Sequence, residues 1–276
     1  MGKTIGIYRI THKEIDPLYI PGYKTLLVGA CKNNTFENDY IHDNIGENIS
    51  EYNDSYCELT GLYWIWKNAQ EDILGLVHYR RLFANIKPHF DFIGRHVVFT
   101  NKEPYSFITR EDVMRKLKKA DVIVKQSEFR MKSVEKIFIR QLGKEMFDQI
   151  SESVRRNNPE YMSTYERFCR SHSHINCNMF IGKRDILINY CEWLFPILTM
   201  IDSMHIEQCG ERYHNREIGY VSELLFGVWL KYNNIKYTTA PVVFTEDPTV
   251  VNGVIYFKNL FSFIANRAEK KMKKEK

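Results

Sequence analysis

The hydrophobic and polar positions of the chain follow two different periods. Short apolar runs bounded by polar residues predict strands at residues 4–10, 26–30, 73–77, 95–100, 121–125, 176–182 and 235–244. Apolar residues at helical spacing predict helices at residues 56–68, 110–119, 184–200 and 218–232. Strands that alternate with helices in this way favour an α/β fold.

Two of the predicted helices carry a further signal. Ser55 is followed three residues later by Glu58, which is the spacing of a capping box, so we expect a helix to begin near Tyr56. A capping box would engage the Glu58 carboxylate with a backbone amide, which favours a structural role for Glu58 over a catalytic one. Pro196 lies inside the helix predicted at residues 184–200 and should bend or break it.

The chain is expected to form one domain and a tail. Residues 1–257 read as a single domain, in which the polar and helical pattern of about residues 128–174 indicates a helical insertion or lid. Residues 258–276 form a basic amphipathic tail, with these apolar residues on one side of a helix: Leu260, Phe261, Ile264, Ala268 and Met272. Such a helix can lie on an anionic membrane surface, and a frayed, solvated tail is the alternative.

The positive charge of the chain is concentrated in this tail. The formal net charge is +5, and seven basic residues against two acidic ones from Lys258 onward account for all of it. The remaining chain is neutral overall, so we expect no nucleic-acid partner. No apolar run reaches the roughly 20 residues of a spanning helix, and the first residues resemble a strand more than a signal peptide. We therefore expect a cytoplasmic protein, with peripheral contact to the inner face of the plasma membrane.

Two adjacent arginines follow the predicted strand at residues 73–77. The sequence there is His78, Tyr79, Arg80 and Arg81, just past the carboxyl end of the strand, where open α/β sheets bind ligands. Each guanidinium group can donate two parallel hydrogen bonds to anionic oxygens, so the pair suits a diphosphate. The alternative is a structural ion pair with a carboxylate, and the residues alone leave both interpretations open.

Several sequence blocks together resemble one bacterial family. They are NIS at residues 48–50, YCELTGLYWIWKN at 56–68, HYRR at 78–81, NMFI at 178–181, YCEWLF at 190–195 and GYVSELL at 219–225. This family was long catalogued as a domain of unknown function and is associated with capsular, exopolysaccharide and O-antigen biosynthesis. Its members are similar to glycosyltransferases of the GT-A type. The resemblance implies a GT-A-like nucleotide-sugar-binding fold with a mixed, mainly parallel central sheet.

The resemblance also implies a donor site. Thr11, His12 and Lys13 follow the first strand, which lies near the nucleotide in similar transferases. GT-A enzymes commonly hold Mn or Mg on the donor diphosphate with an Asp-X-Asp motif, and the corresponding residues here are His78, Tyr79 and Arg80. We hypothesise that Arg80 or Arg81 neutralises the diphosphate and makes the metal dispensable. Asp121 and Asp247 are the candidate ligands if a metal is used instead.

Transfer with inversion needs a base, and Glu223 is the best candidate in the sequence. On a helix, Arg212, Arg216, Tyr220 and Glu223 fall on one side, opposite the apolar stripe, although a solvated, salt-bridged face would look the same. His78 is the second catalytic candidate. The candidates for contacts to the sugar or the acceptor are Asn178, Arg216 and Tyr220.

The resemblance thus implies a hexosyltransferase of bacterial surface polysaccharide synthesis. The resemblance implies a nucleoside diphosphate sugar as donor, with UDP-galactose or UDP-galactofuranose as the first choice, and a lipid-linked or oligosaccharide precursor as acceptor. One alternative is a sugar nucleotidyltransferase, although the chain has no glycine-rich phosphate loop near the first strand. Another is a non-catalytic, membrane-associated binding subunit of the polysaccharide machinery.

Overall fold

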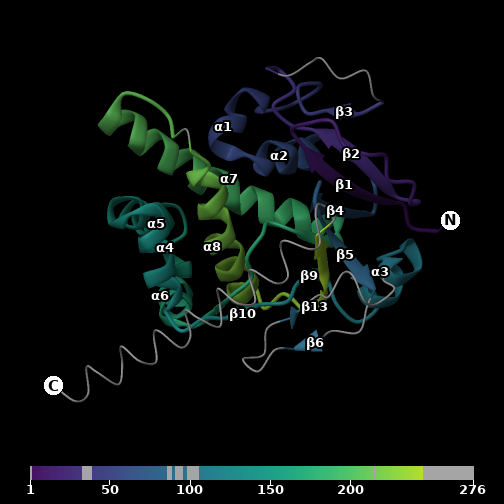
Figure 1. Ribbon diagram of the computed structural model, residues 1–276. Helices are drawn as coiled ribbons and strands as arrows, with labels where there is room; N and C mark the ends of the chain where they lie inside the picture. The colour runs from purple at the N-terminus through teal and green to yellow at the C-terminus, as the bar shows by residue number, and fades with distance from the viewer. Residues whose placement is uncertain are drawn as a thin grey trace.

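The computed structural model describes residues 2–32, 39–85, 89–90, 96–97, 106–213 and 215–244 (Figure 1). A central sheet runs through the molecule. Its main path has, in spatial order, β13 (Tyr237–Ala240), β9 (Val122–Lys125), β12 (Phe180–Lys183), β4 (Ile73–His78), β1 (Ile5–Thr11), β2 (Tyr23–Leu27) and β3 (Ile41–His42). Three further strands join this sheet through β4, namely β5 (Arg81–Asn85), β8 (Ser106–Phe107) and β14 (Val242–Phe244).

The sheet is mixed and mainly parallel along this path, as predicted. β1 pairs in parallel with both β2 and β4, and β9 pairs in parallel with β13. β12 is the exception, because it runs antiparallel to both β4 and β9. The carboxyl ends of β1, β4 and β9 therefore lie at one edge of the sheet, which is the edge where α/β proteins bind ligands.

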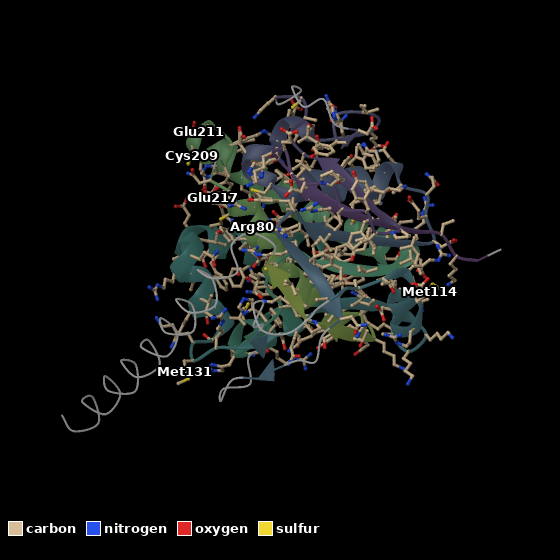
Figure 2. The ribbon with its side chains drawn as sticks, turned by 45° about the vertical axis from the view of Figure 1, so that its right-hand side comes forward. Arg80, Met114, Met131, Cys209, Glu211 and Glu217 are labelled. Carbon is tan, nitrogen blue, oxygen red and sulfur yellow. The ribbon has the colours of Figure 1, made fainter. Side chains whose placement is uncertain are left out.

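Helices cover both faces of the sheet. They are α1 (Asn53–Tyr56), α2 (Glu58–Asn68), α3 (Arg110–Leu117), α4 (Val134–Leu142), α5 (Lys144–Asn157), α6 (Met162–Arg170), α7 (Arg184–Cys209) and α8 (Glu217–Tyr232). Along β1, Ile7 packs into the smaller core that includes α3, and Tyr8 packs into the larger core with α2, α7 and α8. Side chains alternate between faces of a strand, so β1 is buried on both sides. Figure 2 shows Met114 of α3 and Met131 on opposite sides of the molecule.

The segment between β9 and β12 is largely helical. It carries α4, α5 and α6 together with a two-stranded pair, β10 (Glu128–Phe129) and β11 (Ser173–His174). Phe138 and Phe147 of this segment belong to the larger core. α6 packs closely on α8, because a Cβ at Gly227 would lie 2.3 Å from the ring of Phe168. The insertion is therefore packed against the core of the domain.

Two helix predictions are wrong in detail. α7 continues through Pro196 to Cys209, so it is longer than predicted and is not broken at the proline, while the bend there stays a prediction. The apolar residues that flank the proline, Phe195 and Ile197, are buried in the core. This packing outweighs the hydrogen bond that proline cannot donate. The predicted helix at residues 56–68 begins instead at Glu58, after a break at Cys57.

Parts of the prediction lie outside the described residues. They are the tail at residues 258–276 and, apart from β7 (His96–Val97) and its partner β6 (His89–Phe90), the strand expected at 95–100. In the described ranges, no helix has both the length and the apolar character needed to cross a bilayer.

A buried carboxylate fixes the loop that follows β2. Asp43, with 0% of its surface exposed, accepts hydrogen bonds from the backbone N–H groups of Gly29 and Ala30, both at 3.0 Å, and from the hydroxyl of Ser50. Gly29 adopts φ +64°, and a Cβ there would lie 2.9 Å from the side chain of Asn53. Asp43 therefore holds a tight turn directly against the start of α1.

We expect Asp43→Asn to lower the free energy of unfolding by about 2–3 kcal/mol, because an amide nitrogen would face a backbone N–H group in a buried site. Urea denaturation measures this change. Asp148→Asn, which removes a carboxylate from an exposed ion pair with Lys144, is the matched control and should change stability by less than about 0.5 kcal/mol. Equal effects of the two substitutions would contradict a structural role for Asp43.

Candidate active site

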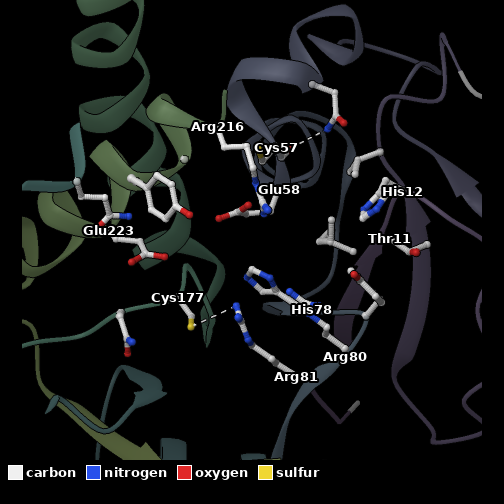
Figure 3. A pocket seen from close by; sticks show the side chains of 18 of the residues that line it. Thr11, His12, Cys57, Glu58, His78, Arg80, Arg81, Cys177, Arg216 and Glu223 are labelled. Carbon is white, nitrogen blue, oxygen red and sulfur yellow. Dashed lines mark hydrogen bonds between the residues drawn. The ribbon is translucent and has the colours of Figure 1, made fainter. Parts of the chain in front are cut away.

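A cavity of about 660 Å³ opens at the edge of the sheet where β1 and β4 end (Figure 3). The turns after these strands, the first turns of α2 and α8, and the insertion surround it. Both charges are present on its wall, which carries four arginines and three carboxylates. Ligand pockets for small molecules usually have about 300–1,000 Å³, so the cavity has room for a substrate.

The structure brings most of the predicted site residues together. Eight of them line this cavity: Thr11, His12, His78, Arg80, Arg81, Arg216, Tyr220 and Glu223. Lys13 lies next to it, with its ammonium group 4.8 Å from the centre of the Tyr79 ring. Asn178 is buried behind the wall, and its amide contacts Glu58. The geometry therefore gives Asn178 a supporting position in place of the expected contact with a sugar.

The parallel pairing of β1 with β4 positions the donor candidates. Ile10 is in register with His78, so the residues that follow each strand lie side by side. The rings of His12 and Tyr79 meet edge to face, with 5.4 Å between their centres. The Thr11 hydroxyl donates to the carbonyl of Lys13 at 2.6 Å, which closes the turn after β1.

A buried arginine holds the turn that carries the two adjacent arginines. Arg9 donates from Nε and Nη2 to the carbonyl oxygen of Tyr79, at 3.1 and 2.9 Å. His78 pairs directly with Arg81 across β4 and β5, so Tyr79 and Arg80 form a tight turn between them. Both Arg80 and Arg81 line the cavity, and Nη1 of Arg81 lies 3.6 Å from Sγ of Cys177.

Glu58 is the site residue that the sequence analysis set aside. The predicted capping box does not form, because Cys57 adopts φ 51° and ψ −124° and no side chain caps α2. An N-cap residue normally has extended backbone, which lets its neighbours reach the first turn. Glu58 instead turns toward the cavity, where Asn178 donates to its Oε1 at 2.7 Å. A positive φ at a cysteine cannot be recognised from the sequence pattern.

The first turn of α8 supplies the opposite wall. The helix begins at Glu217, so Arg216 precedes it at φ 68°. Arg212 lies outside the helix and pairs with buried Asp202, so its expected place on the same helical face is wrong. Tyr220 and Glu223 do share the cavity side of α8. The alternative of a solvated, salt-bridged face therefore does not apply to these two residues.

The environment of Glu223 favours its protonated form. Burial raises the pKa of Glu223 to about 7, and the nearby charge of Glu58 acts in the same direction. A hydrogen bond from the backbone N–H of Cys177 and the positive charges of Arg81 and Lys125 oppose this rise. A carboxylate that titrates near neutral pH can exchange a proton with a substrate.

His78 is kept neutral by the same cavity. Burial lowers the pKa of its imidazole, the charge of Glu58 opposes this effect, and the charges of Arg81, Arg216 and Arg80 add to it. Its Nε2 is buried and has no hydrogen-bond partner among the residues that the structure describes. In Figure 3, the side chain lies between Glu58 and Arg81, near the centre of the cavity. A neutral imidazole there can hydrogen-bond to a bound substrate.

Strained backbone is concentrated at this cavity. Among the described residues, the non-glycine residues with positive φ are Cys57, Cys177, Arg216 and Asn234. The first three line the cavity. Such conformations persist where the surrounding structure determines them, and they cluster at functional sites.

The residues after β4 do not fit a divalent cation. Guanidinium groups carry donors and no lone pair for a metal, and Arg80 and Arg81 add positive charge there. Asp121 lies at the amino end of β9, far along the sheet from the cavity edge, and is paired with Lys183 at 2.5 Å. Asp247 lies outside the described residues. In the part of the chain that the structure describes, no three His, Cys, Asp or Glu side chains are grouped to hold a metal.

The insertion adds residues that the sequence analysis did not single out. Arg130, Gln141 and His174 line the cavity from this segment. Glu128 and His174 are paired partners of β10 and β11, which brings the two ends of the insertion together at the wall. No local pattern in the sequence indicates this pairing, because both strands have only two residues.

Comparison with solved structures finds a match to the apo structure of the bifunctional glycosyltransferase WbbM, with a TM-score of 0.74 and 26% sequence identity. The match covers 88% of this chain and 46% of the WbbM chain, so this chain spans about half the length of that enzyme. The match and the mixed, mainly parallel sheet identify a GT-A-like fold, which confirms the expected fold class. Comparison with curated proteins gives no match.

Comparison with family models also gives a clear result. The matching model is described as "Domain of unknown function (DUF4422)" and aligns with residues 6–234. This range includes the cavity residues from both strand ends, the insertion and α8. Because the match spans most of the 276 residues, the chain belongs to the DUF4422 family.

Proposed function

We propose that this chain transfers a sugar from a nucleoside diphosphate donor to a hydroxyl group of an acceptor. The observation that carries this proposal is the joint placement of Arg80, Arg81 and Glu223 on one cavity at the carboxyl edge of a GT-A-like sheet. Glycosyl transfer needs a group that stabilises the departing diphosphate and a group that takes the acceptor proton. The cavity offers both.

The two arginines serve the leaving group. As the bond between the sugar and the diphosphate breaks, negative charge grows on the phosphate oxygens. Arg80 and Arg81 donate fixed hydrogen bonds to these oxygens, and Arg9 holds their turn in place. His12 and Thr11, at the end of β1, lie on the side of the cavity assigned to the nucleotide.

Glu223 serves the acceptor. Its ionised carboxylate accepts the proton of the acceptor hydroxyl as the oxygen of that hydroxyl attacks the sugar carbon. Tyr220 and Arg216 lie on the same wall and supply polar contacts for the acceptor or the transferred sugar. His78, neutral and near the centre of the cavity, hydrogen-bonds to the reacting sugar.

The finer identity of the substrates follows from the family resemblance. We propose a UDP-linked hexose, with galactose or galactofuranose first, and a lipid-linked or oligosaccharide precursor of a bacterial surface polysaccharide as acceptor. WbbM, the structural neighbour, is itself a glycosyltransferase, which supports the class of reaction. A cytoplasmic site of action at the membrane surface would suit a lipid-linked acceptor.

A panel of sugar nucleotides tests the proposal. The true donor should raise the melting temperature of the purified protein, because ligand at about 100 times its Kd stabilises the folded state by about 2.7 kcal/mol. The same donor should be consumed when acceptor is added. Stabilisation without consumption would favour a binding subunit, and release of pyrophosphate from a nucleoside triphosphate would favour a nucleotidyltransferase.

Metal removal tests the role of the arginines. We expect full turnover in EDTA, since two guanidinium groups replace the cation at the diphosphate. Arg80→Ala should raise the KM for the donor about tenfold or more, because it removes charge-assisted hydrogen bonds. Arg156→Ala, in an exposed pair with Glu152, is the control and should leave the KM unchanged. Strict dependence on Mn or Mg would contradict this assignment.

Substitution of Glu223 tests the base. Glu223→Gln should lower turnover about 100-fold or more and leave donor binding intact, because the amide cannot accept the proton. In the wild type, turnover should fall as pH drops through about 7, since protonation of Glu223 removes the base below its raised pKa. Initial rates between pH 5 and 9 measure this limb. Normal turnover of the variant would remove Glu223 from the mechanism.

A further inference from the structure

Glu58 occupies a fixed place on the cavity wall. It is the first residue of α2, and the break at Cys57 turns its carboxylate toward the cavity, as Figure 3 shows. The start of α8 lies against it, because a Cβ at Gly219 would be 3.9 Å from both carboxylate oxygens. Two helices therefore restrict where this carboxylate can lie.

A neutral amide holds the Glu58 carboxylate. Asn178, with only 5% of its surface exposed, donates from Nδ2 to Oε1 of Glu58 at 2.7 Å and to the carbonyl of Gly219 at 3.0 Å. Both hydrogens of the amide are thus used in the protein. An amide fixes the position of a carboxylate without cancelling its charge, whereas an ion pair would do both. The negative charge of Glu58 therefore acts on the cavity, where Arg216 and His78 are the groups that face it.

Glu223 is one of the groups on which this charge acts. The groups that act on Glu223 come from several elements: Glu58 of α2, Arg81 of β5, Lys125 of β9 and the backbone N–H of Cys177. His78 of β4 and Tyr220 of α8 line the same cavity. Arg81, Lys125 and the N–H group favour the ionised form of Glu223, and Glu58 opposes it. In Figure 3, the carboxylates of Glu58 and Glu223 both face the open centre of the cavity.

We propose that Glu58 is a positioning residue of the transfer reaction, whose fixed negative charge makes Glu223 a stronger base. The catalytic role of Glu58 rests on the proposed function, whereas the electrostatic coupling between Glu58 and Glu223 is a property of the folded chain. When two carboxylates share one site, their pKa values move apart. One carboxylate then remains ionised while the other exchanges a proton.

The proton and electron balance of the step assigns a different role to each carboxylate. The acceptor oxygen forms a bond to the sugar carbon, and its proton passes to Glu223. The bond from that carbon to the diphosphate oxygen breaks, and its electron pair leaves with the diphosphate. Glu58 takes no proton in this step. It stabilises the proton on Glu223, which raises the driving force for proton transfer.

The pH dependence of turnover tests this role. In Glu58→Gln, the amide oxygen can still accept from Asn178, so the change removes the charge and keeps the hydrogen bond. The acidic limb of the profile is the range in which turnover falls as pH drops. We expect this limb to shift to lower pH by about one unit, because a nearby like charge shifts a carboxyl pKa by about that much. The rate at high pH should fall several-fold, since Glu223 becomes a weaker base.

Two further variants separate charge from structure. Glu58→Asp keeps the charge and should keep the limb close to that of the wild type. Glu51→Gln removes an exposed carboxylate from the neighbouring short helix, Ser50–Tyr52, and should leave the limb unchanged. A uniform loss of rate in Glu58→Gln with an unmoved limb would mean a merely structural role and overturn the proposal.

A direct titration of Glu223 measures the coupling without relying on turnover. Protein labelled with ¹³C at the glutamate side-chain carboxyl reports each glutamate, and the Glu223 signal is the one missing from Glu223→Gln. Its midpoint should lie near pH 7 in the wild type and about one unit lower in Glu58→Gln. An identical midpoint in both proteins overturns the proposal. A shifted midpoint in a protein that consumes no sugar nucleotide would instead refute the proposed function and retain the coupling.

Discussion

The parallel pairing of β1 with β4 is the constraint on which the candidate site depends. This pairing brings Thr11 and His78 to one edge, and the buried guanidinium of Arg9 reaches across it to the carbonyl of Tyr79. Arg9 is 7% exposed, so its hydrogen bonds form in a poorly solvated place, where a lost partner would be costly. The positions of Arg80 and Arg81 thus depend on the hydrogen bonds that the Arg9 side chain donates to the backbone of their turn.

The sequence was most informative where local periodicity and burial agree. The apolar run at residues 73–77 and the arginines after it correctly located a strand end and a cavity, because a strand buried on both faces must end in polar residues at the sheet edge. It was least informative at Glu58. The spacing from Ser55 fits a capping box, but the backbone of Cys57 decides against it, and that conformation follows from the packing of α1, α2 and α8.

The insertion illustrates a second limit of sequence reasoning. Its helices are visible in the pattern of residues 128–174, yet the part that reaches the cavity is not. Arg130 and His174 come together because β10 and β11 pair across more than forty residues of chain. Such a pairing depends on how α4 and α6 pack against α8, which a local pattern does not contain.

The way the two carboxylates are held supports the proposal that one cavity both binds a diphosphate and provides a base. The amide of Asn178 fixes Glu58 beside Arg216, and burial keeps Glu223 able to hold a proton near neutral pH. The backbone at Cys57 and Arg216 adopts positive φ to allow this arrangement, and the packed cores of α2 and α8 stabilise it. The strained residues Cys57, Cys177 and Arg216 therefore all lie on the wall of the cavity.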